Sequence, residues 1–362
     1  MPERVANVGQ FIRVTGERVP TDAIDRRAVR IDIHSHFFPR LSREQASVLE
    51  TPGAPWLRED GDGAGYLMAG DSEYRPVEAP LWDPAARIAQ MDATSVDVQV
   101  MSATPMLFSY SSGVEQTKRW ASMINDLALE ICAHEPLRLR TLCQVPLQDV
   151  DAACIEVKRS FEAGHVGVHI GNHVTGRNLD DPELVRFLAF CADQGIPILV
   201  HPWDMMAGDR MPKHMLKWLV GMPAETHLAI MSLILSGVFE RLPSDLRLCF
   251  CHGGGNFAAQ IGRVDNAWRR RDIVRADCPH LPSSYSSRFF VDSAVFSDDA
   301  LRLLVAVMGE DHILMGSDYP FPLGEIEPGR LICESNHLDD RAKTLLLGGN
   351  ANKFFELGVS DA

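Results

Sequence analysis

Short apolar runs alternate with helical stretches along most of this 362-residue chain, and this alternation limits its possible folds more than any other feature. Most runs are rich in Val, Ile, Leu or Phe and lack a regular polar alternation, which is typical of buried parallel strands. They predict eight strands, at residues 29–34, 96–103, 139–146, 166–171, 196–201, 246–251, 288–294 and 312–317.

Helical stretches are expected between these strands, near residues 84–93, 114–134, 149–163, 181–193, 224–240, 255–271, 297–308 and 340–356. Eight β/α units in about 330 residues favour a (β/α)₈ TIM barrel, whose active site lies at the carboxyl ends of the strands. The main alternative is a doubly wound open sheet. No G-x-G-x-x-G motif follows the first strand to support that alternative.

Three segments fall outside the repeating pattern. Residues 1–29 form an N-terminal extension, expected to be partly disordered at best, and the barrel is expected to occupy 30–357. The Gly- and Pro-rich stretch 40–82 predicts a small β-rich insertion after the first strand, over the active-site face. A long excursion at 202–223 could cap the pocket.

Composition narrows the class of protein. A net charge of −14 argues against a nucleic-acid partner. The eight cysteines contain no C-x-x-C pair, and several lie in apolar runs, as reduced core thiols do. The N-terminal residues do not resemble a signal peptide, and the longest apolar run, LAIMSLILSGVF, is too short to span a bilayer. We therefore expect a cytoplasmic protein with no membrane contact.

Metal-ligand residue types stand at the ends of the predicted strands: His34 and His36 after the first, then His201, His252 and Asp318. A strand projects alternate residues to one face, so His34 and His36 point the same way. Three imidazoles and a carboxylate can hold Zn²⁺ and leave one position open for water. If the strands share one barrel, these residues predict a catalytic metal site.

Several longer motifs resemble the metal-dependent decarboxylase branch of the amidohydrolase superfamily, whose members are (β/α)₈ barrels. The resemblance runs from about Arg30 to Leu357. The most specific motifs are HPWDMM, CHGGG and GSDYPFPLGE, and others are IDIHSHFFPR, YRPV, LWDPAARI, MPAETHLAIMSLILSG and GRVDNAWRRRDIV.

The resemblance implies a role for each matching residue. His34, His36 and His201 would be metal ligands. Asp318 would be both the carboxylate ligand and a catalytic residue, and His252 would act as acid and base beside the metal rather than as a permanent ligand.

The resemblance also implies a substrate clamp and a cofactor. Arg75 would bind a substrate carboxylate, and Arg263 would reach the active site of a neighbouring subunit, so a homodimer is expected. The cofactor would be one Zn²⁺ per subunit, although nitrogen and oxygen ligands also suit Co²⁺ and Fe²⁺. Strand four offers His169 and no Lys for a bridging carbamate, which favours a single-metal site.

The implied reaction is the non-oxidative decarboxylation of 2-amino-3-carboxymuconate 6-semialdehyde to 2-aminomuconate 6-semialdehyde and CO₂. The resemblance places it in tryptophan (kynurenine) or nitrobenzoate catabolism. Three alternatives stay open at this point. One is decarboxylation of an isomeric carboxymuconate semialdehyde or a hydroxybenzoate, another is hydrolysis of an amide, ester or lactone, and the third is ligand binding without turnover.

Individual residues also have simpler interpretations. Arg75 could form a surface salt bridge and Arg263 an ion pair in a dimer interface. Cys251 could be a reactive thiol, although a buried core thiol is expected. Asp292 could orient a metal ligand or hold a strand to its loop. Trp203, Met205, Met206 and Phe296 could line the pocket or belong to the core.

Overall fold

Eight parallel strands form a closed barrel, as the sequence predicts. The structure is a computed structural model and describes residues 28–359; residues 1–27, most of the expected extension, lie outside the described residues. The barrel strands are β1 (Ile31–Phe37), β5 (Val98–Ala103), β6 (Leu139–Thr141), β7 (Val168–Gly171), β10 (Ile198–His201), β11 (Leu248–Phe250), β12 (Phe290–Asp292) and β13 (Ile313–Leu314).

Two isolated bridges close the ring. The strands pair in parallel within two sheets, β1-β5-β6 and β7-β10-β11-β12-β13. Cys143 bridges to Val168 and joins β6 to β7, while Ser35 bridges to Tyr319 beyond β13. All of these pairings are parallel, so the carboxyl ends of all eight strands meet at one end of the barrel. The doubly wound alternative is therefore wrong.

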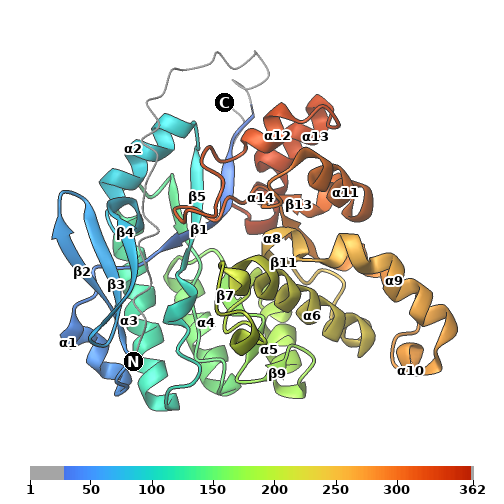
Figure 1. The fold of residues 1–362 in the computed structure, drawn as a ribbon, viewed down its shortest axis with the longest axis horizontal. Coiled ribbons are helices and arrows are strands. Elements are labelled where there is room, and N and C mark those ends of the chain that lie inside the picture. Colours follow the sequence, from blue (N-terminus) through green and yellow to red (C-terminus); the bar gives the residue numbers. More distant parts are fainter. Residues whose placement is uncertain (1–27, 360–362) are drawn as a thin grey trace.

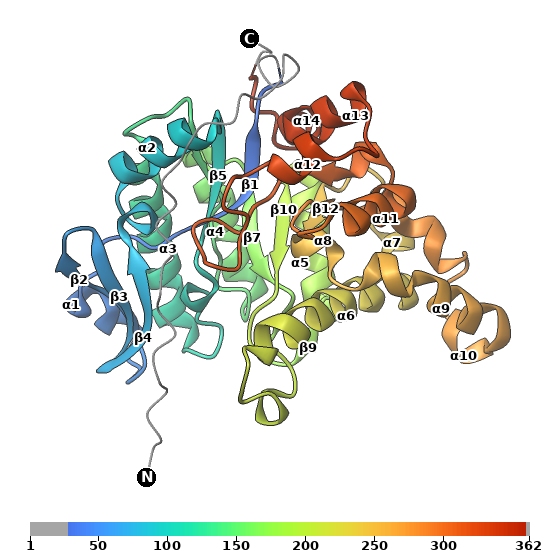
Figure 2. The ribbon, with the colours of Figure 1, turned by 45° about the horizontal axis from the view of Figure 1, so that its top comes forward.

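Helices surround the barrel strands (Figures 1 and 2). The longer ones are α2 (Pro84–Thr94), α3 (Val114–Cys132), α4 (Val150–Ala163), α5 (Pro182–Asp193), α6 (Met222–Leu235), α9 (Phe257–Arg270), α11 (Asp298–Met308) and α14 (Asn350–Phe355). Short helices are α1 (Arg43–Ala46), α7 (Val238–Arg241), α8 (Cys251–Gly254), α10 (Asp272–Arg275), α12 (Arg330–Glu334) and α13 (Asp340–Thr344). Side chains cap several helices: Asp181 accepts the Glu183 N–H at 3.0 Å, and Ser297 accepts the Ala300 N–H at 3.3 Å.

Two of the predicted helical stretches are not regular α-helices throughout. The stretch 224–240 divides into α6 and α7 because the chain turns at Gly237, whose φ is 66°. A side chain there would meet the Asp277 carbonyl, since a Cβ would lie 2.2 Å from that oxygen. The stretch 340–356 is helical from Asp340 to Phe355, as predicted, but it includes a π-helical turn at Leu345–Gly349 between α13 and α14.

The apolar segment around α6 is longer than the sequence run suggests. A π-helical turn, Lys217–Gly221, continues directly into α6. The resulting 19-residue helix, Lys217–Leu235, contains an 18-residue window with a mean hydropathy of 1.4, and it is long and apolar enough to cross a membrane by length and composition alone. The expectation that this region is too short was wrong on length. Of the 18-residue window with this hydropathy, 44% is buried in the protein.

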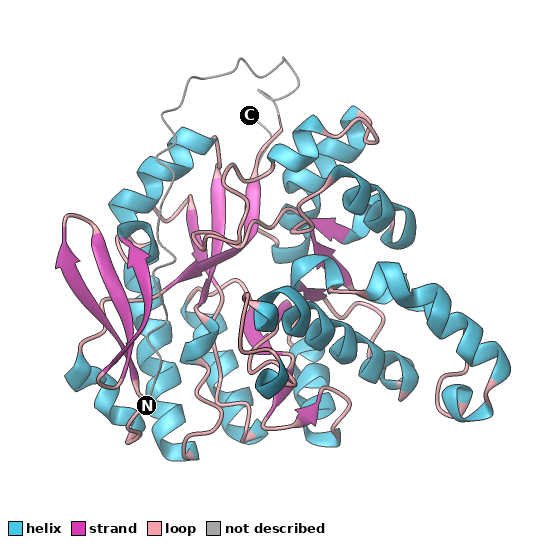
Figure 3. Cartoon of the chain, in the orientation of Figure 1, coloured by secondary structure: helices cyan, strands magenta, loops and turns pink. Residues whose placement is uncertain are grey.

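The expected β-rich insertion is an antiparallel sheet of β2 (Pro55–Gly61), β3 (Ala64–Ala69) and β4 (Ser72–Glu78). It lies beside the barrel as a separate sheet (Figure 3). A second small pair, β8 (His173–Val174) and β9 (Arg177–Asn178), follows β7.

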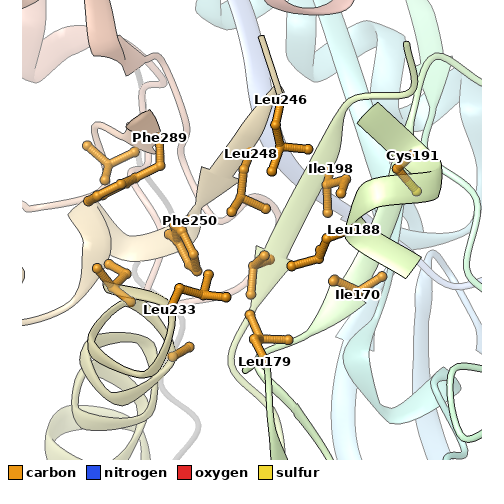
Figure 4. Packing of buried hydrophobic residues seen from close by; sticks show 14 of the residues in the cluster. Ile170, Leu179, Leu188, Cys191, Ile198, Leu233, Leu246, Leu248, Phe250 and Phe289 are labelled. Atoms are coloured by element: carbon orange, nitrogen blue, oxygen red, sulfur yellow. The ribbon is translucent and has the colours of Figure 1, made fainter. Parts of the chain in front are cut away.

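Apolar side chains fill both the barrel interior and the layer around it. The interior contains a cluster that includes Ile33, Val100, Leu142, Leu199 and Leu314, all 0–1% exposed. The outer layer packs the strands against the helices, as Ile170, Ile198, Leu233, Phe250 and Phe289 show in Figure 4. The apolar interior supports a polar layer at the carboxyl ends of the strands.

Candidate metal centre

Three histidines and an aspartate meet at the carboxyl end of the barrel. His34 and His36 come from β1, His201 is the last residue of β10, and Asp318 follows β13. One ligand atom from each residue lies within 4.8 Å of the others, and all four residues are buried. The structure therefore brings together the four residues predicted as metal ligands.

Each histidine is oriented by a hydrogen bond at Nδ1. His34 Nδ1 lies 2.6 Å from Asp292 Oδ2, and His201 Nδ1 lies 2.7 Å from the Pro202 carbonyl. His36 Nδ1 lies 3.2 Å from the Ser102 hydroxyl. Because Nδ1 carries the proton in this arrangement, Nε2 is free to bind a metal ion.

The three Nε2 atoms are buried and have no hydrogen-bond partner within residues 28–359. Asp318 Oδ1 lies 3.1 Å from His36 Nε2 and 3.4 Å from His34 Nε2. Ligand atoms about 2.0–2.1 Å from a tetrahedral Zn²⁺ are about 3.3 Å apart, so these separations suit a shared ion. The donor set fits a divalent metal.

Two of the three imidazoles are held neutral by burial. Burial lowers the pKa of His36 to about 4 and that of His201 well below its ordinary value, so both rings are neutral at pH 7. Burial also acts to lower the pKa of His34, but Cys251, Asp292 and Asp318 hold it well above its ordinary value. Burial alone would raise the pKa of Asp318, but the neighbouring rings of His252, His34 and His36 hold it well below its usual range. Asp318 is therefore a carboxylate, and its negative charge balances part of an ion's charge.

His252 stands beside this group and not within it. Its Nε2 is 3.8 Å from Asp318 Oδ2, and its side chain is 12% exposed. Its backbone lies in the left-handed region, with φ 57° and ψ 47°, and its N–H donates to Asp292 at 2.9 Å. Gly253 continues this left-handed turn, with φ 59°. A side chain there would clash with Val295, because a Cβ would lie 2.4 Å from it. The position suits an acid/base, a role that stays a prediction.

Asp292 has both of the roles considered for it: it orients a ligand residue, and it holds a strand to its loop. It binds His34 through Nδ1, and it also accepts N–H bonds from His252, Gly253 and Ala294 at 2.7–3.1 Å. Gly316 makes this packing possible, because a Cβ there would lie 2.8 Å from both His34 and Asp292. One carboxylate thus holds a ligand and the loop that carries His252.

Arg75 lies on β4 and contacts Phe321, an aromatic neighbour of the ligand His36. Its guanidinium lies 4.7 Å from the ring centroid of Phe321 and 5.9 Å from that of Trp218, and Phe321 is 5.2 Å from the His36 ring. It forms no ion pair with a carboxylate in the described part of the chain, so the surface salt bridge considered above is not found there. Its charge remains available for an anion.

Arg263 lies on the exposed surface of α9, which projects from the barrel with α10 (Figure 1). Within residues 28–359, no hydrogen bond or ion pair joins it to the metal ligands of its own chain. Its assignment to a neighbouring subunit's site therefore stays a prediction.

Residues considered for the pocket wall differ in exposure. Trp203 is half-buried, with its ring 5.2 Å from that of Tyr110 and 5.5 Å from that of His173. Met206 and Phe296 are 37% and 53% exposed, so neither belongs to the core. Burial raises the pKa of Cys251 to about 11, which favours the core thiol over a reactive one.

The sequence did not predict a buried polar network that joins β1, β5, α2 and the segment after β13. Asp32 accepts the Ser317 hydroxyl at 2.6 Å and the Gln99 amide at 3.3 Å, and burial raises its pKa to about 6. Arg87 donates to Gln99 at 2.8 Å and to the carbonyl of His36. A charged residue within an otherwise apolar strand, as at Asp32, was the available signal.

The fold and the site together define a metal-dependent barrel of the amidohydrolase type. The chain belongs to the amidohydrolase family, whose model matches residues 31–357.

The chain's relatives in that family include two decarboxylases that match it over nearly its whole length. It is 38% identical to the 2-amino-3-carboxymuconate-6-semialdehyde decarboxylase of Dictyostelium discoideum, over 91% of this chain and 92% of the relative. It is 31% identical to the protein of the same name from Caenorhabditis elegans, over 91% and 94%.

A solved structure shares the fold at lower identity. The dihydroxybenzoic acid decarboxylase of Polaromonas sp. JS666, solved with manganese and the inhibitor 2-nitroresorcinol, has a TM-score of 0.72 and 20% identity. The match covers 92% of this chain and 98% of that one.

Proposed function

We propose that this chain is a metal-dependent carboxy-lyase that converts 2-amino-3-carboxymuconate 6-semialdehyde to 2-aminomuconate 6-semialdehyde and CO₂. The observation that carries the proposal is the buried His₃Asp donor set with His252 beside it, in a chain 38% identical to such a decarboxylase over nearly its whole length. It would act in tryptophan (kynurenine) or nitrobenzoate catabolism.

His34, His36, His201 and Asp318 would hold one divalent ion, and we propose Zn²⁺, since three imidazoles and a carboxylate suit it. When bound, such an ion supplies Lewis acidity that polarises water or a substrate oxygen. Elemental analysis of the purified protein tests the assignment. One zinc per chain supports it, and manganese or iron at that ratio contradicts it.

The protein's own residues bind the substrate and handle the proton. The Arg75 guanidinium would bind a carboxylate in two places and hold the substrate over the ligand group. Phe321 and Trp218 flank Arg75 and exclude water on those sides. The C–C bond to the departing carboxylate would break with its electron pair left on the carbon, and CO₂ would leave. His252, protonated from solvent, would deliver that proton to the carbon.

We further propose a homodimer in which Arg263 contributes to the partner's site. Arg263 is exposed on a projecting helix, and the adjacent α10 carries Ile273, which is 82% exposed. Mixing Arg263→Ala with His252→Ala protein tests this. Each variant alone would be inactive, and random re-pairing would restore about a quarter of the parental activity, because half of the dimers would contain one intact site. No recovery after verified subunit exchange would contradict the shared site.

The substrate assignment is tested by following the absorbance of freshly generated 2-amino-3-carboxymuconate 6-semialdehyde. Decay well above the rate of spontaneous cyclisation supports it. A dihydroxybenzoate assayed in parallel tests the second candidate, which the fold similarity to the Polaromonas enzyme favours. Turnover of dihydroxybenzoate alone would replace the proposed substrate.

A further inference from the structure

A buried pair of polar side chains, Asn172 and Glu225, lies behind the segment that carries His201. Asn172 follows β7 and is 2% exposed, while Glu225 lies in the first turn of α6 and is 4% exposed. Asn172 Nδ2 donates to Glu225 Oε2 at 2.7 Å. The pair thus connects a barrel strand end to a surrounding helix.

These two residues hold the segment 201–206 at three points. The backbone N–H of Asn172 donates to the His201 carbonyl at 3.2 Å, and its Oδ1 accepts the Trp203 N–H at 3.0 Å. Glu225 Oε1 accepts the Met206 N–H at 2.7 Å. The segment therefore has a metal-ligand residue at its start and the half-buried Trp203 in its middle.

The Pro202 carbonyl, which orients His201 through Nδ1, lies between the first two of these points. A shift of this segment would turn the His201 ring and move the Trp203 indole together. Glu225 has no ion-pair partner among residues 28–359, so N–H donors alone stabilise its buried carboxylate. Loss of one donor from such a group is costly, which keeps the arrangement in a single conformation.

We propose that Asn172 and Glu225 are positioning residues that fix His201 for metal binding and Trp203 for substrate binding. Neither side chain belongs to the ligand group. The proposal depends on the proposed function only for the identity of the substrate. Metal binding by His201 can be measured without any substrate.

Swapping the amide and the carboxylate between positions 172 and 225 tests whether the hydrogen bonds of this pair position His201 and Trp203. In Asn172→Asp, a second carboxylate faces Glu225 and the donor is lost. In Glu225→Gln, the amide cannot accept from both Asn172 and Met206. In the double variant, the new amide at position 225 can donate to the new carboxylate at position 172. That carboxylate can still accept the Trp203 N–H, and the amide oxygen can accept the Met206 N–H. All three side-chain hydrogen bonds and the net charge are then restored.

Cobalt is the probe, because its visible absorption reports the ligand geometry. Each single variant is expected to bind Co²⁺ about 10- to 100-fold more weakly, the usual effect of losing a group that supports a ligand. The double variant should recover affinity and spectrum to within about 3-fold of the parent. Tryptophan emission should shift in the singles and return in the double. With substrate, KM should rise more than kcat falls wherever Trp203 is displaced.

Glu156→Gln is a matched control. Glu156 is also a buried helix carboxylate bonded to an asparagine, since Asn125 Nδ2 lies 2.7 Å from it. This variant should lose stability and keep the parental cobalt spectrum.

Parental cobalt binding in both single variants, or a double variant no better than the worse single, would overturn the proposal. If a single variant does not fold, a folded double variant with parental cobalt affinity still supports the pair, and an unfolded double contradicts it. The double variant could recover Co²⁺ affinity while the parent protein decarboxylates none of the tested substrates. That result would overturn the proposed function and leave this inference standing.

Discussion

The four proposed ligands and His252 differ in their surroundings, and this difference predicts opposite effects of alanine. A ring nitrogen of His201 lies within 4.8 Å of the ligand atoms of His34, His36 and Asp318, whereas His252 lies outside this group, with its Nε2 3.8 Å from Asp318 Oδ2. We expect His201→Ala to lose the metal and His252→Ala to retain it while losing turnover. Elemental analysis beside activity measurement distinguishes them. Metal loss from His252→Ala would make His252 a ligand.

Asp292 should control metal affinity without touching the metal. Its Oδ2 accepts the proton of His34 Nδ1 at 2.6 Å, which fixes the ring and increases its basicity. In Asp292→Asn an amide N–H₂ would face donors from His34 or Gly253. Zinc affinity, measured by competition with a chelator, should fall about 10- to 100-fold. Asp299→Asn is the control, since that carboxylate is 88% exposed, and unchanged affinity in Asp292→Asn would contradict the argument.

At the level of elements, strand ends were predictable and contacts between distant segments were not. Apolar runs gave all eight barrel strands, and their closing residues gave His34, His36, His201 and Asp318, because parallel strands in a barrel share one carboxyl end. The Asn172–Glu225 pair joins residues 53 positions apart, which no local pattern reveals. The break at Gly237 likewise depends on a contact with the distant Asp277.

The insertion sheet matters because β4 carries Arg75. We expect Arg75→Met to raise KM about 10- to 100-fold, since a hydrogen bond to a charged group contributes about 1.5–3 kcal/mol. Initial-rate kinetics measure this effect. Arg58→Met in the same sheet is the control, because Arg58 is already paired with Asp60 and Glu73. Equal effects of the two substitutions would mean that the sheet, and not the Arg75 charge, binds substrate.

At the scale of the whole molecule, His165 should make stability depend on pH. Burial lowers its pKa from 6.5 to about 4, so the unfolded chain binds more protons between these values. Stability is therefore complete above pH 6.5 and falls as the pH decreases toward 4. Between pH 7.5 and pH 5, the parent should lose about 2 kcal/mol more than His165→Asn. Urea unfolding of the metal-saturated proteins measures this, and equal losses would contradict it.

The central claim is that one metal site in this barrel removes CO₂ from the amino-carboxymuconate substrate. Titration of metal into chelated protein, with CO₂ release measured at each step, tests it most directly. We expect CO₂ release to rise linearly and to level off at one ion per chain, with one CO₂ for each substrate consumed. Substrate loss without CO₂, or full activity in the chelated protein, would contradict the claim.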